Sequence, residues 1–487
     1  MNDNYKQKAI STNLEESLAE VRQIANNSSD ILINRLVIGN ISCAVLGCEG
    51  MLSTAIMTDL IIKPLTEIPM QLDSENLFQH IQNHLLLSLD RPVVRNYKDF
   101  FKLLYSGFAI LFAEGQNKAL AFGVQGYDKR SIGEPSGEKN ILGAQEGFIE
   151  TIRTNMSLIR RRMKTPLLKF EISQIGNLSQ TDICLCYMTD RVPAQLLQQV
   201  KKKLASVKLD TVLSTGYLES FLEKCRGSLF DSVSLTQRPD VLCSKLLEGR
   251  IALLIDGTPF VIVIPKLFVE NFQTLDDYND KPYYATFSRW IKYLGFLLAI
   301  LLPALYIAVC MHHPELLNST LVLILTQAEQ KAPLSLPVET IFVLLMYEII
   351  REAGLRLPKS VGGAVSIVAG LIIGDSAVSS GLISTPMLTM VAISVIAGFI
   401  TPDLNPVITV LRLAFIITGG LWGLFGIGLL GMIVLFNLCA TENFGFPVTA
   451  PLAPFIPKSM RDVATRVNFQ QMQSGNFTVE EYHEQNS

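Results

Sequence analysis

Apolar and polar positions are arranged in two different ways along the chain. Up to about Arg289, short apolar runs alternate with charged and polar stretches, as they do in soluble proteins of mixed structure. From Leu294 to Ala440 the apolar runs are long and charged residues are few. A helix needs about 20 mainly apolar residues to cross a bilayer. The pattern therefore predicts a soluble α/β region followed by an all-α polytopic membrane bundle.

The soluble region contains two stretches of similar design. The first opens with two β-prone runs in RLVIGNISCAVLGC and closes with the hairpin GFAILFAEGQNKALAFGV. The second opens with LKFEISQIGNLSQTDICLCYM and closes with GRIALLIDGTPFVIVIP, in which IDG supplies the turn. We expect tandem α/β subdomains over 31–135 and 166–285, preceded by a polar segment over 1–30. The alternative is that strand–turn–strand pairs recur by chance.

Residues 136–165 are expected to form a linker that becomes helical from about Gln145. Five basic residues fall along this helix: Arg153, Arg160, Arg161, Arg162 and Lys164. One interpretation is a docking helix for an acidic partner, a neighbouring subunit or phospholipid headgroups. The other is a solvated linker whose basic side chains pair with nearby carboxylates.

The membrane region, over 286–440, contains about five apolar segments and is followed by a tail over 441–487. The segments are Leu294 to Cys310, Val338 to about Leu357, Val361 to Val378, Met387 to Ile400 and Val407 to Cys439. The fifth is longer than one crossing requires and is interrupted by a glycine-rich stretch over 419–428. It forms either one tilted helix or a hairpin that returns the tail to the starting side.

Lysine and arginine positions predict the orientation of these segments. Arg289, Trp290 and Lys292 are interpreted as interfacial anchors, and the two basic residues place the start of the first segment inside. Arg351, Arg356 and Lys359 place the second-to-third connection inside, and Arg412 again indicates inside. The basic residues of the tail, Lys458, Arg461 and Arg466, favour the hairpin. The polar N-terminus has no apolar core of a signal peptide, so the soluble region is expected in the cytoplasm.

Ionisable residues lie where the pattern predicts membrane. Glu348, Arg351 and Glu352 end the second segment, and Asp375 interrupts the third. A charge at the bilayer centre costs about 2.5–3.5 kcal/mol even on the lenient insertion scale, so such groups face protein or water. Small residues recur along the third segment at Gly363, Ser366, Gly370 and Gly374. They either leave room for a conducting path or simply pack helices while Glu348 pairs with Arg351 at the rim.

Composition and motifs exclude several classes of function. The net charge of −3 gives no general attraction for nucleic acid. The eight cysteines are scattered and contain no CxxC pair, which disfavours a zinc site and a disulfide framework. His80 and His84 stand four apart, but further ligands for a metal are lacking. No phosphate loop and no paired nucleophile and base occur, so neither an enzyme nor a cofactor is expected.

At REAGLRLP and GGAVSIVAGLIIG the chain resembles the GerA-type spore germination proteins, the A subunits of germinant receptors. Further similar pieces follow in order between about Tyr127 and Phe455, including EGF, LIRRR, RPD, EGRIALLIDGTPFVIVIP and APLAPF. The resemblance implies a multi-pass protein of the spore inner membrane with a cytosolic N-terminal region. It also implies B and C receptor subunits as partners, a ring of A subunits (a pentamer) and release of monovalent cations.

The residue pattern and the resemblance together single out particular residues of this chain as candidates. The subunit-contact candidates are Glu134, Glu146, Arg160, Arg161, Arg162, Arg238 and Asp240. The pore or ion-path candidates are Glu348, Arg351, Glu352, Gly363, Ser366, Gly370, Gly374 and Asp375. Asp375 stands where glutamine is common in the family, and an acid that faces water there favours cations.

Three functions are compatible with these residues. The first is a subunit of a nutrient-responsive, cation-conducting channel that triggers germination. The second is an accessory germination protein that amplifies ion release without binding nutrient. The third is a non-conducting scaffold or a transporter-like subunit, although the inverted repeats common in transporters are not visible in the membrane region.

Overall fold

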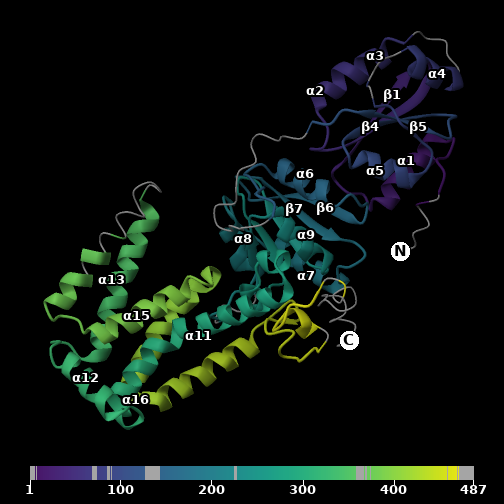
Figure 1. Ribbon diagram of the computed structural model, residues 1–487. Coiled ribbons are helices and arrows are strands. Elements are labelled where there is room, and N and C mark those ends of the chain that lie inside the picture. Colours follow the sequence, from purple (N-terminus) through teal and green to yellow (C-terminus); the bar gives the residue numbers. More distant parts are fainter. Residues whose placement is uncertain are drawn as a thin grey trace.

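The structure is a computed structural model of the 487-residue chain. It describes residues 6, 8–68, 74–84, 88, 90–126, 143–223, 228–357, 367, 370–372, 374–457, 459–468 and 470. Two sheets with their helices form the N-terminal part, and a group of long helices extends away from the second sheet (Figure 1).

The first sheet has five antiparallel strands in the order β1-β2-β4-β5-β3. Helices cover both of its faces because alternate residues of β4 enter two different cores. Ile110 and Phe112 pack with α1 and α5, while Ala109 and Leu111 pack with the helices of the other face. The strands are β1 Ile31–Ile38, β2 Ile41–Cys48, β3 Val93–Val94, β4 Phe108–Ala113 and β5 Ala119–Gly123; the helices are α1 Leu14–Ile24, α2 Thr54–Met57 continuing through the π-turn Thr58–Ile62 into α3 Lys63–Thr66, α4 Ser74–His84 and α5 Tyr97–Leu104.

The second sheet repeats this order as β6-β7-β9-β10-β8. Ala252 and Leu254 of β9 pack with α6 and α9, whereas Ile251 and Leu253 pack with α7 and α8. The repeat of one design that the two opening and closing strand pairs indicated is therefore confirmed. The elements are α6 Ile152–Arg162, β6 Leu168–Ile175, β7 Thr181–Met188, α7 Ala194–Ala205, α8 Thr215–Leu222, β8 Ser234–Thr236, α9 Pro239–Leu247, β9 Ile251–Ile255 and β10 Val261–Ile264.

Each repeat begins with a helix that the sequence pattern placed outside it. α1 lies within the expected polar segment 1–30, yet Leu14, Leu18 and Val21 enter the core of the first sheet. α6 lies within the expected linker 136–165, yet Ile152 and Ile159 enter the core of the second sheet. The subdomain boundaries move outward because amphipathic helices complete both cores.

The C-terminal region is helical, and it begins with α11 (Pro282–His312). The second and fourth apolar segments correspond to α13 (Leu336–Arg356) and α15 (Thr385–Gly398), and only part of the third is described, with a helical stretch over 374–379. The structure adds a helix that the sequence pattern did not predict, α12 (Ser319–Glu329). Among the described residues two helices are long and apolar enough to cross a membrane, Pro282–His312 and Pro402–Ala440. α15 is too short for that criterion.

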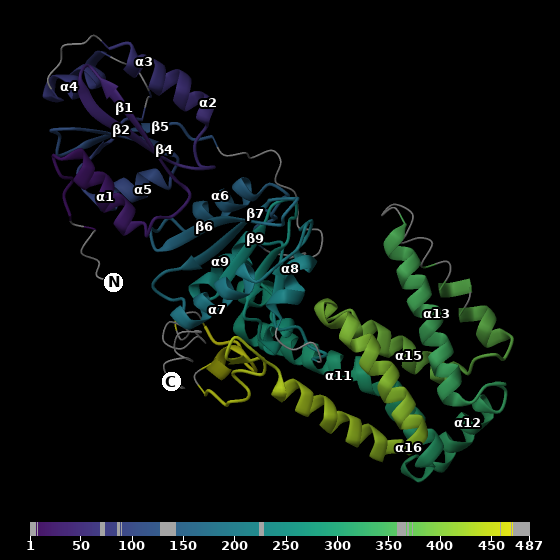
Figure 2. The same ribbon diagram turned by 180° about the vertical axis from the view of Figure 1, so that it is seen from behind.

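The fifth apolar segment forms α16 (Asn405–Ala440), which consists of two helical halves. They meet at Gly423, where φ is 60° and ψ is −145°, a conformation that favours glycine. The first half runs beside α11, and the second half returns toward the second sheet (Figure 2). The hairpin interpretation is therefore confirmed for this segment.

The return of α16 places the tail beside the second subdomain. Asn437 accepts a hydrogen bond from the backbone N–H of Leu229, and the Thr441 hydroxyl donates to Ser228. A short hairpin, β11 (Glu442–Asn443) and β12 (Phe446–Pro447), then follows, and Phe444 and Phe446 enter the core over α7 and α8. The tail and the sheets consequently lie at the same end of the helical region.

Candidate functional site

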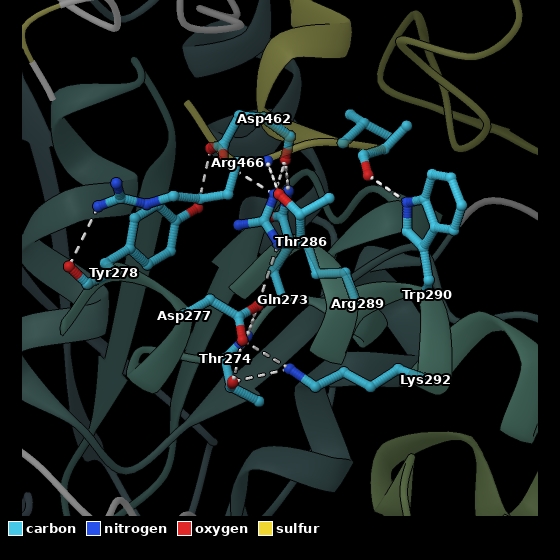
Figure 3. A network of polar contacts seen from close by, with 12 residues as sticks. Gln273, Thr274, Asp277, Tyr278, Thr286, Arg289, Trp290, Lys292, Asp462 and Arg466 are labelled. Carbon is cyan, nitrogen blue, oxygen red and sulfur yellow. Dashed lines mark hydrogen bonds and ion pairs between the residues drawn. The ribbon is translucent and has the colours of Figure 1, made fainter. Parts of the chain in front are cut away.

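Two successive helices and a distant segment of the chain meet where the second subdomain joins the helical region (Figure 3). They are the short helix α10 (Asp276–Asn279), the first turns of α11 and the tail around Asp462. The carboxylate of Asp277, 3% exposed, accepts from Arg289 Nε at 3.1 Å and from Lys292 Nζ at 2.9 Å. Two cations from α11 thus neutralise one buried carboxylate, as a buried charge requires.

The tail completes this junction from the other side. Arg289 also pairs with the Asp462 carboxylate at 3.0 Å, and the Tyr278 hydroxyl donates to the same carboxylate at 2.8 Å. Burial raises the pKa of Tyr278 well above its usual value, and the Asp462 charge raises it further against the opposing effect of Arg289. The phenol therefore stays protonated and remains a donor. Gln273 donates to the Asp462 carbonyl at 2.7 Å.

The sequence interpretation of Arg289 and Lys292 as interfacial anchors is wrong, because both side chains are buried in this junction. Trp290, between them, is 61% exposed and donates from Nε1 to the carbonyl of Ala464 at 2.8 Å. The first helix is therefore fixed to the tail and to the second subdomain through specific polar contacts. A displacement of α11 must move all three segments or break these contacts.

The two subdomains are joined by an arginine of the basic helix. Arg160 is 1% exposed, and its Nε donates to Asp30 at 2.8 Å, across from α6 to the residue before β1. Its guanidinium lies between the rings of Tyr105 and Phe170, at 4.2 and 4.9 Å from their centroids. Burial by itself lowers the pKa of Arg160, but the neighbouring Asp30 and other groups outweigh it and raise the pKa, so the guanidinium stays charged. Arg160 thus has no surface to offer a neighbouring subunit.

The other subunit-contact candidates form two groups within the chain. Glu146 accepts from Arg161 and, at 2.6 Å, from Arg162. Burial by itself raises the pKa of Glu146, but the two arginines outweigh it and lower the pKa. The basic residues of α6 thus pair with carboxylates, as the second interpretation of this helix expected.

Arg238 and its carboxylate partner, Asp240, form the second group. Its guanidinium donates to both oxygens of Asp240, at 3.1 and 2.7 Å, and to the carbonyl of Ala144 at 2.8 Å. Glu146, Arg161, Arg162 and Asp240 remain partly exposed, while Arg238 is buried. Glu134 lies outside the described residues.

The charged residues in the C-terminal half of α13 are paired with each other or with α16. Glu348 and Arg351 form an ion pair at 2.7 Å, and Glu348 also accepts from the Thr409 hydroxyl at 3.1 Å. Glu352 pairs with Arg356 at 2.7 Å on the exposed side of the helix. The structure therefore brings Glu348 and Arg351 together, half-buried against α16, and directs Glu352 away from them.

The described part of the third segment presents an open face. A Cβ atom added at Gly370 or Gly374 would meet no atom within 4 Å, and Asp375 is exposed. Within the described part of the chain, Asp375 has no hydrogen-bond or ion-pair partner. Gly363 and Ser366 lie outside the described residues. This face therefore has no covering from the described part of its own chain.

Beside this face lies a groove of about 900 Å³ between α13, residues 370–383 and α15. Its walls are almost entirely apolar, and they include Tyr347, Arg351, Gly370, Gly374 and Ile383. Many large apolar side chains of the neighbouring helices are also exposed, for example Leu355, Leu371 and Phe425. Exposed apolar surface of this extent marks a region covered by lipid or by another chain.

One arginine in the apolar region was missed as a structural residue. Arg412 was interpreted only as an orientation signal, yet it is buried between α11, α15 and α16. Its Nε donates to the carbonyl of Ala299 at 2.7 Å, and its Nη2 donates to the carbonyl of Ser394 at 3.2 Å. The available signal was Pro303 in the first apolar run, because a proline leaves the carbonyl four residues earlier without its helical donor.

The described residues contain no group of three or more His, Cys, Asp or Glu that could hold a metal. Burial raises the pKa of Cys43 to about 12 and that of Cys243 to about 12, so these thiols stay protonated. Cys184 and Cys186 face the same core, as their spacing in a strand indicated. The polar groups described above thus hold segments of the chain together beside a largely apolar, exposed helical surface, an arrangement typical of a membrane-associated protein with an additional α/β part.

Comparison with known proteins specifies this class. The family model described as Bacillus/Clostridium GerA spore germination protein matches residues 19–476, so the chain belongs to the GerA spore germination family. It is 35% identical to spore germination protein KA of Bacillus subtilis (strain 168), over 94% of this chain and 85% of that protein. It is 28% identical to spore germination protein GerLA of Bacillus cereus, over 93% of each chain.

A solved structure is similar to part of this chain. It is the crystal structure of the N-terminal domain of the A subunit of the Bacillus megaterium spore germinant receptor GerK3. The match has a TM-score of 0.44 and 28% sequence identity, and it covers 54% of this chain and 98% of that chain.

Proposed function

We propose that this chain is the A subunit of a nutrient-responsive germinant receptor, and that several copies surround a path for monovalent cations in the spore inner membrane. The family and the germination proteins that the chain resembles support the receptor role. The sheets and the tail then lie on the cytoplasmic side, in agreement with the basic residues at the start of the first apolar segment. B and C subunits are the expected partners.

The observation that carries the proposal is the uncovered face of the third segment. Asp375 is exposed on an otherwise apolar helix, whereas Glu348 and Arg351 pair with each other and Arg412 is bonded to backbone carbonyls. An unpaired carboxylate in lipid is unfavourable by several kcal/mol, so it needs water or a neighbouring chain. Copies arranged around a common axis provide both when Gly370, Gly374 and Asp375 face the axis.

The soluble part controls this path through the junction around Asp277, Arg289 and Asp462. The two subdomains are held together by Arg160 and Asp30, so a displacement of one is transmitted to the other. The second subdomain is in turn fixed to α11. Binding of a partner to the partly exposed Glu146, Arg161 and Arg162 would therefore reach the helical region through buried polar contacts rather than through a mobile linker.

The test is cation flux through the full-length protein in liposomes, with and without the B and C subunits. We expect cation flux that depends on assembly of the subunits. The Asp375→Asn variant should assemble normally and show a several-fold lower flux. Asp403→Asn is the matched control, because Asp403 is an exposed acid of the same region outside the proposed wall. Equal flux in the wild type and Asp375→Asn removes Asp375 from the path. Absence of flux in the complete receptor favours the scaffold.

Charge reversal at Arg161 and Arg162 distinguishes a docking role from conduction. Both are partly exposed, so the fold tolerates the change better than at the buried Arg160. A scaffold that binds through this helix loses its partner, whereas an assembled channel continues to pass ions when opened.

A further inference from the structure

Glu339 is a buried carboxylate that the proposed path does not use. It lies in the first turn of α13 and is 0% exposed. One oxygen, Oε1, accepts from the backbone N–H of Ser384, the residue that precedes α15. The other oxygen, Oε2, is buried without a hydrogen-bond partner among the described residues.

A second carboxylate converges on the same serine. Glu329, at the end of α12, accepts from the Ser384 hydroxyl at 2.8 Å and from the Tyr306 hydroxyl of α11 at 3.2 Å. Three helices and the residue before α15 therefore contribute oxygen atoms to one place, at the end of the helical region remote from the sheets (Figure 1). Neither carboxylate forms an ion pair with any lysine or arginine in the described part of the chain.

The other buried acids show how unusual this arrangement is. Among the described residues the acidic side chains in the buried class are Asp30, Asp277 and Glu339. Asp30 pairs with Arg160, and Asp277 pairs with Arg289 and Lys292. Removal of a carboxylate from water is unfavourable unless a positive charge accompanies it. Around Ser384, by contrast, the two acids Glu339 and Glu329 come together, and no lysine or arginine of the described residues pairs with either of them.

Protonation of Glu339 alone does not satisfy its polar atoms. A neutral carboxyl group would carry its proton on Oε2, the oxygen for which the described residues provide no acceptor. In either protonation state this oxygen lacks a partner, which is costly in a low-dielectric environment. A positive ion at this oxygen would satisfy it, and the lysine and arginine side chains of the described residues supply none.

We propose that Glu339, Glu329, Ser384 and Tyr306 form a binding site for one alkali-metal cation. Carboxylate and hydroxyl oxygens are hard ligands, which suit such ions. Glu339 Oε2 supplies the free ligand atom, and Glu329 supplies the second charge. The absence of a third acidic or histidine ligand among the described residues makes the site less suited to a divalent ion. The cation links the ends of α12, α13 and α15, and its binding does not depend on conduction.

Binding is tested by thermal unfolding of the full-length protein in detergent, followed by the helical circular dichroism signal. KCl or NaCl is titrated against N-methylglucamine chloride at constant ionic strength. We expect a saturable rise of Tm with K⁺ or Na⁺ in the wild type and loss of this rise in Glu339→Gln. Glu329→Gln should shift the midpoint of the titration by about tenfold or more, as changes around a metal site commonly do.

Glu315→Gln is the matched control, because Glu315 is an exposed glutamate on the loop after α11. It should keep the full cation response. An unchanged Tm of the wild type in all salts overturns the proposal, and so does a full response in Glu339→Gln. A rise of Tm with acid that leaves no further effect of K⁺ or Na⁺ shows a proton site instead. If Glu339→Gln does not fold, the cation dependence of Tm in the wild type and in Glu329→Gln tests the proposal instead. If the liposomes show no cation flux while Tm still rises with K⁺ or Na⁺, the proposal of conduction is rejected and the proposal of a binding site is kept.

Discussion

Arg412 donates from Nε to the carbonyl oxygen of Ala299 at 2.7 Å, and this carbonyl is the one that Pro303 deprives of its helical donor. The Ser394 hydroxyl donates to the same oxygen at 2.8 Å. A charged side chain in the apolar region is therefore explained by the backbone defect that it satisfies. In a region without water, such freed carbonyl groups need a partner from a neighbouring helix.

Replacement of this arginine should destabilise the helical region. Arg412→Met removes the donors to Ala299 and Ser394, and hydrogen bonds from charged groups contribute about 1.5–3 kcal/mol each in soluble proteins. We expect a lower Tm of the purified protein and a lower yield of folded protein.

The double variant with Pro303→Ala identifies the cause. Alanine restores an N–H for the Ala299 carbonyl, so Arg412→Met should cost less in the Pro303→Ala background than in the wild type. Additive effects on Tm would show that Arg412 acts through packing or charge instead.

The hairpin of α16 should depend on Gly423. Gly423→Ala places a Cβ 3.0 Å from Cβ of His312 and forces a side chain into a conformation that costs about 1–3 kcal/mol. Gly428→Ala on the second half of the same helix is the control, because its Cβ meets nothing within 4 Å. We expect Gly423→Ala to lower Tm and Gly428→Ala to leave it unchanged or raise it. A similar response of the two variants would contradict the bend.

The contact between the subdomains should be sensitive to Arg160. Arg160→Met leaves Asp30 buried without its cation, and the loss of one partner from a buried pair costs about 3–5 kcal/mol. Arg162→Met should cost far less, since partly exposed pairs contribute about 0–1 kcal/mol. Chemical denaturation of the full-length protein, observed through its soluble part, compares the two. Equal losses of unfolding free energy in the two variants would mean that the buried pair with Asp30 contributes no more to stability than the exposed pair.

Glu171 makes the second subdomain sensitive to acid. Burial by itself raises its pKa, but hydrogen bonds from Lys169, Lys201 and Tyr187 outweigh this and lower the pKa to about 2. A carboxyl group whose pKa is lowered in the folded state stabilises the fold at pH values above 4.5, its pKa in the unfolded chain. This stabilisation is lost as the pH falls toward about 2, its pKa in the folded state. Glu171→Gln should therefore unfold more easily than the wild type near neutral pH.

The same difference should shrink as the pH falls through this window. The measurement is the free energy of unfolding of both proteins from neutral to acid pH. A difference that is independent of pH would show that the carboxylate charge is not responsible.

The tail should be released when its carboxylate is removed. Asp462→Ala removes the acceptor for Arg289 and Tyr278, while Asp277 still holds Arg289 on the other side. We expect faster amide hydrogen exchange over 459–466 with little change in α11. Arg461→Ala, at an exposed neighbouring position, should exchange like the wild type. Slow exchange in both variants would show that apolar contacts alone hold the tail.

Several elements were predictable because their signals are local. The hairpins of the two sheets follow from alternating apolar residues around turns, and Gly257 has the positive φ that the IDG turn requires. The second and fourth apolar segments correspond to helices within about two residues, and the glycine-rich stretch marked the bend at Gly423. The first segment matches the end of α11, but the helix begins at Pro282, well before the predicted Leu294. Charge pairing between Glu348 and Arg351 was also readable, since residues three apart share a helix face.

The sequence by itself therefore determined the two-part organisation and the family and indicated the recurring strand pairs, because periodicity and motifs act over short stretches of chain. Only the tertiary structure decided which charges are buried and with what partner. Arg160 meets Asp30 across 130 positions, Arg412 meets Ala299 across 113, and Glu339 meets Ser384 across 45. No periodic pattern encodes such pairs, because their energy depends on which helices pack and on how completely water is excluded between them.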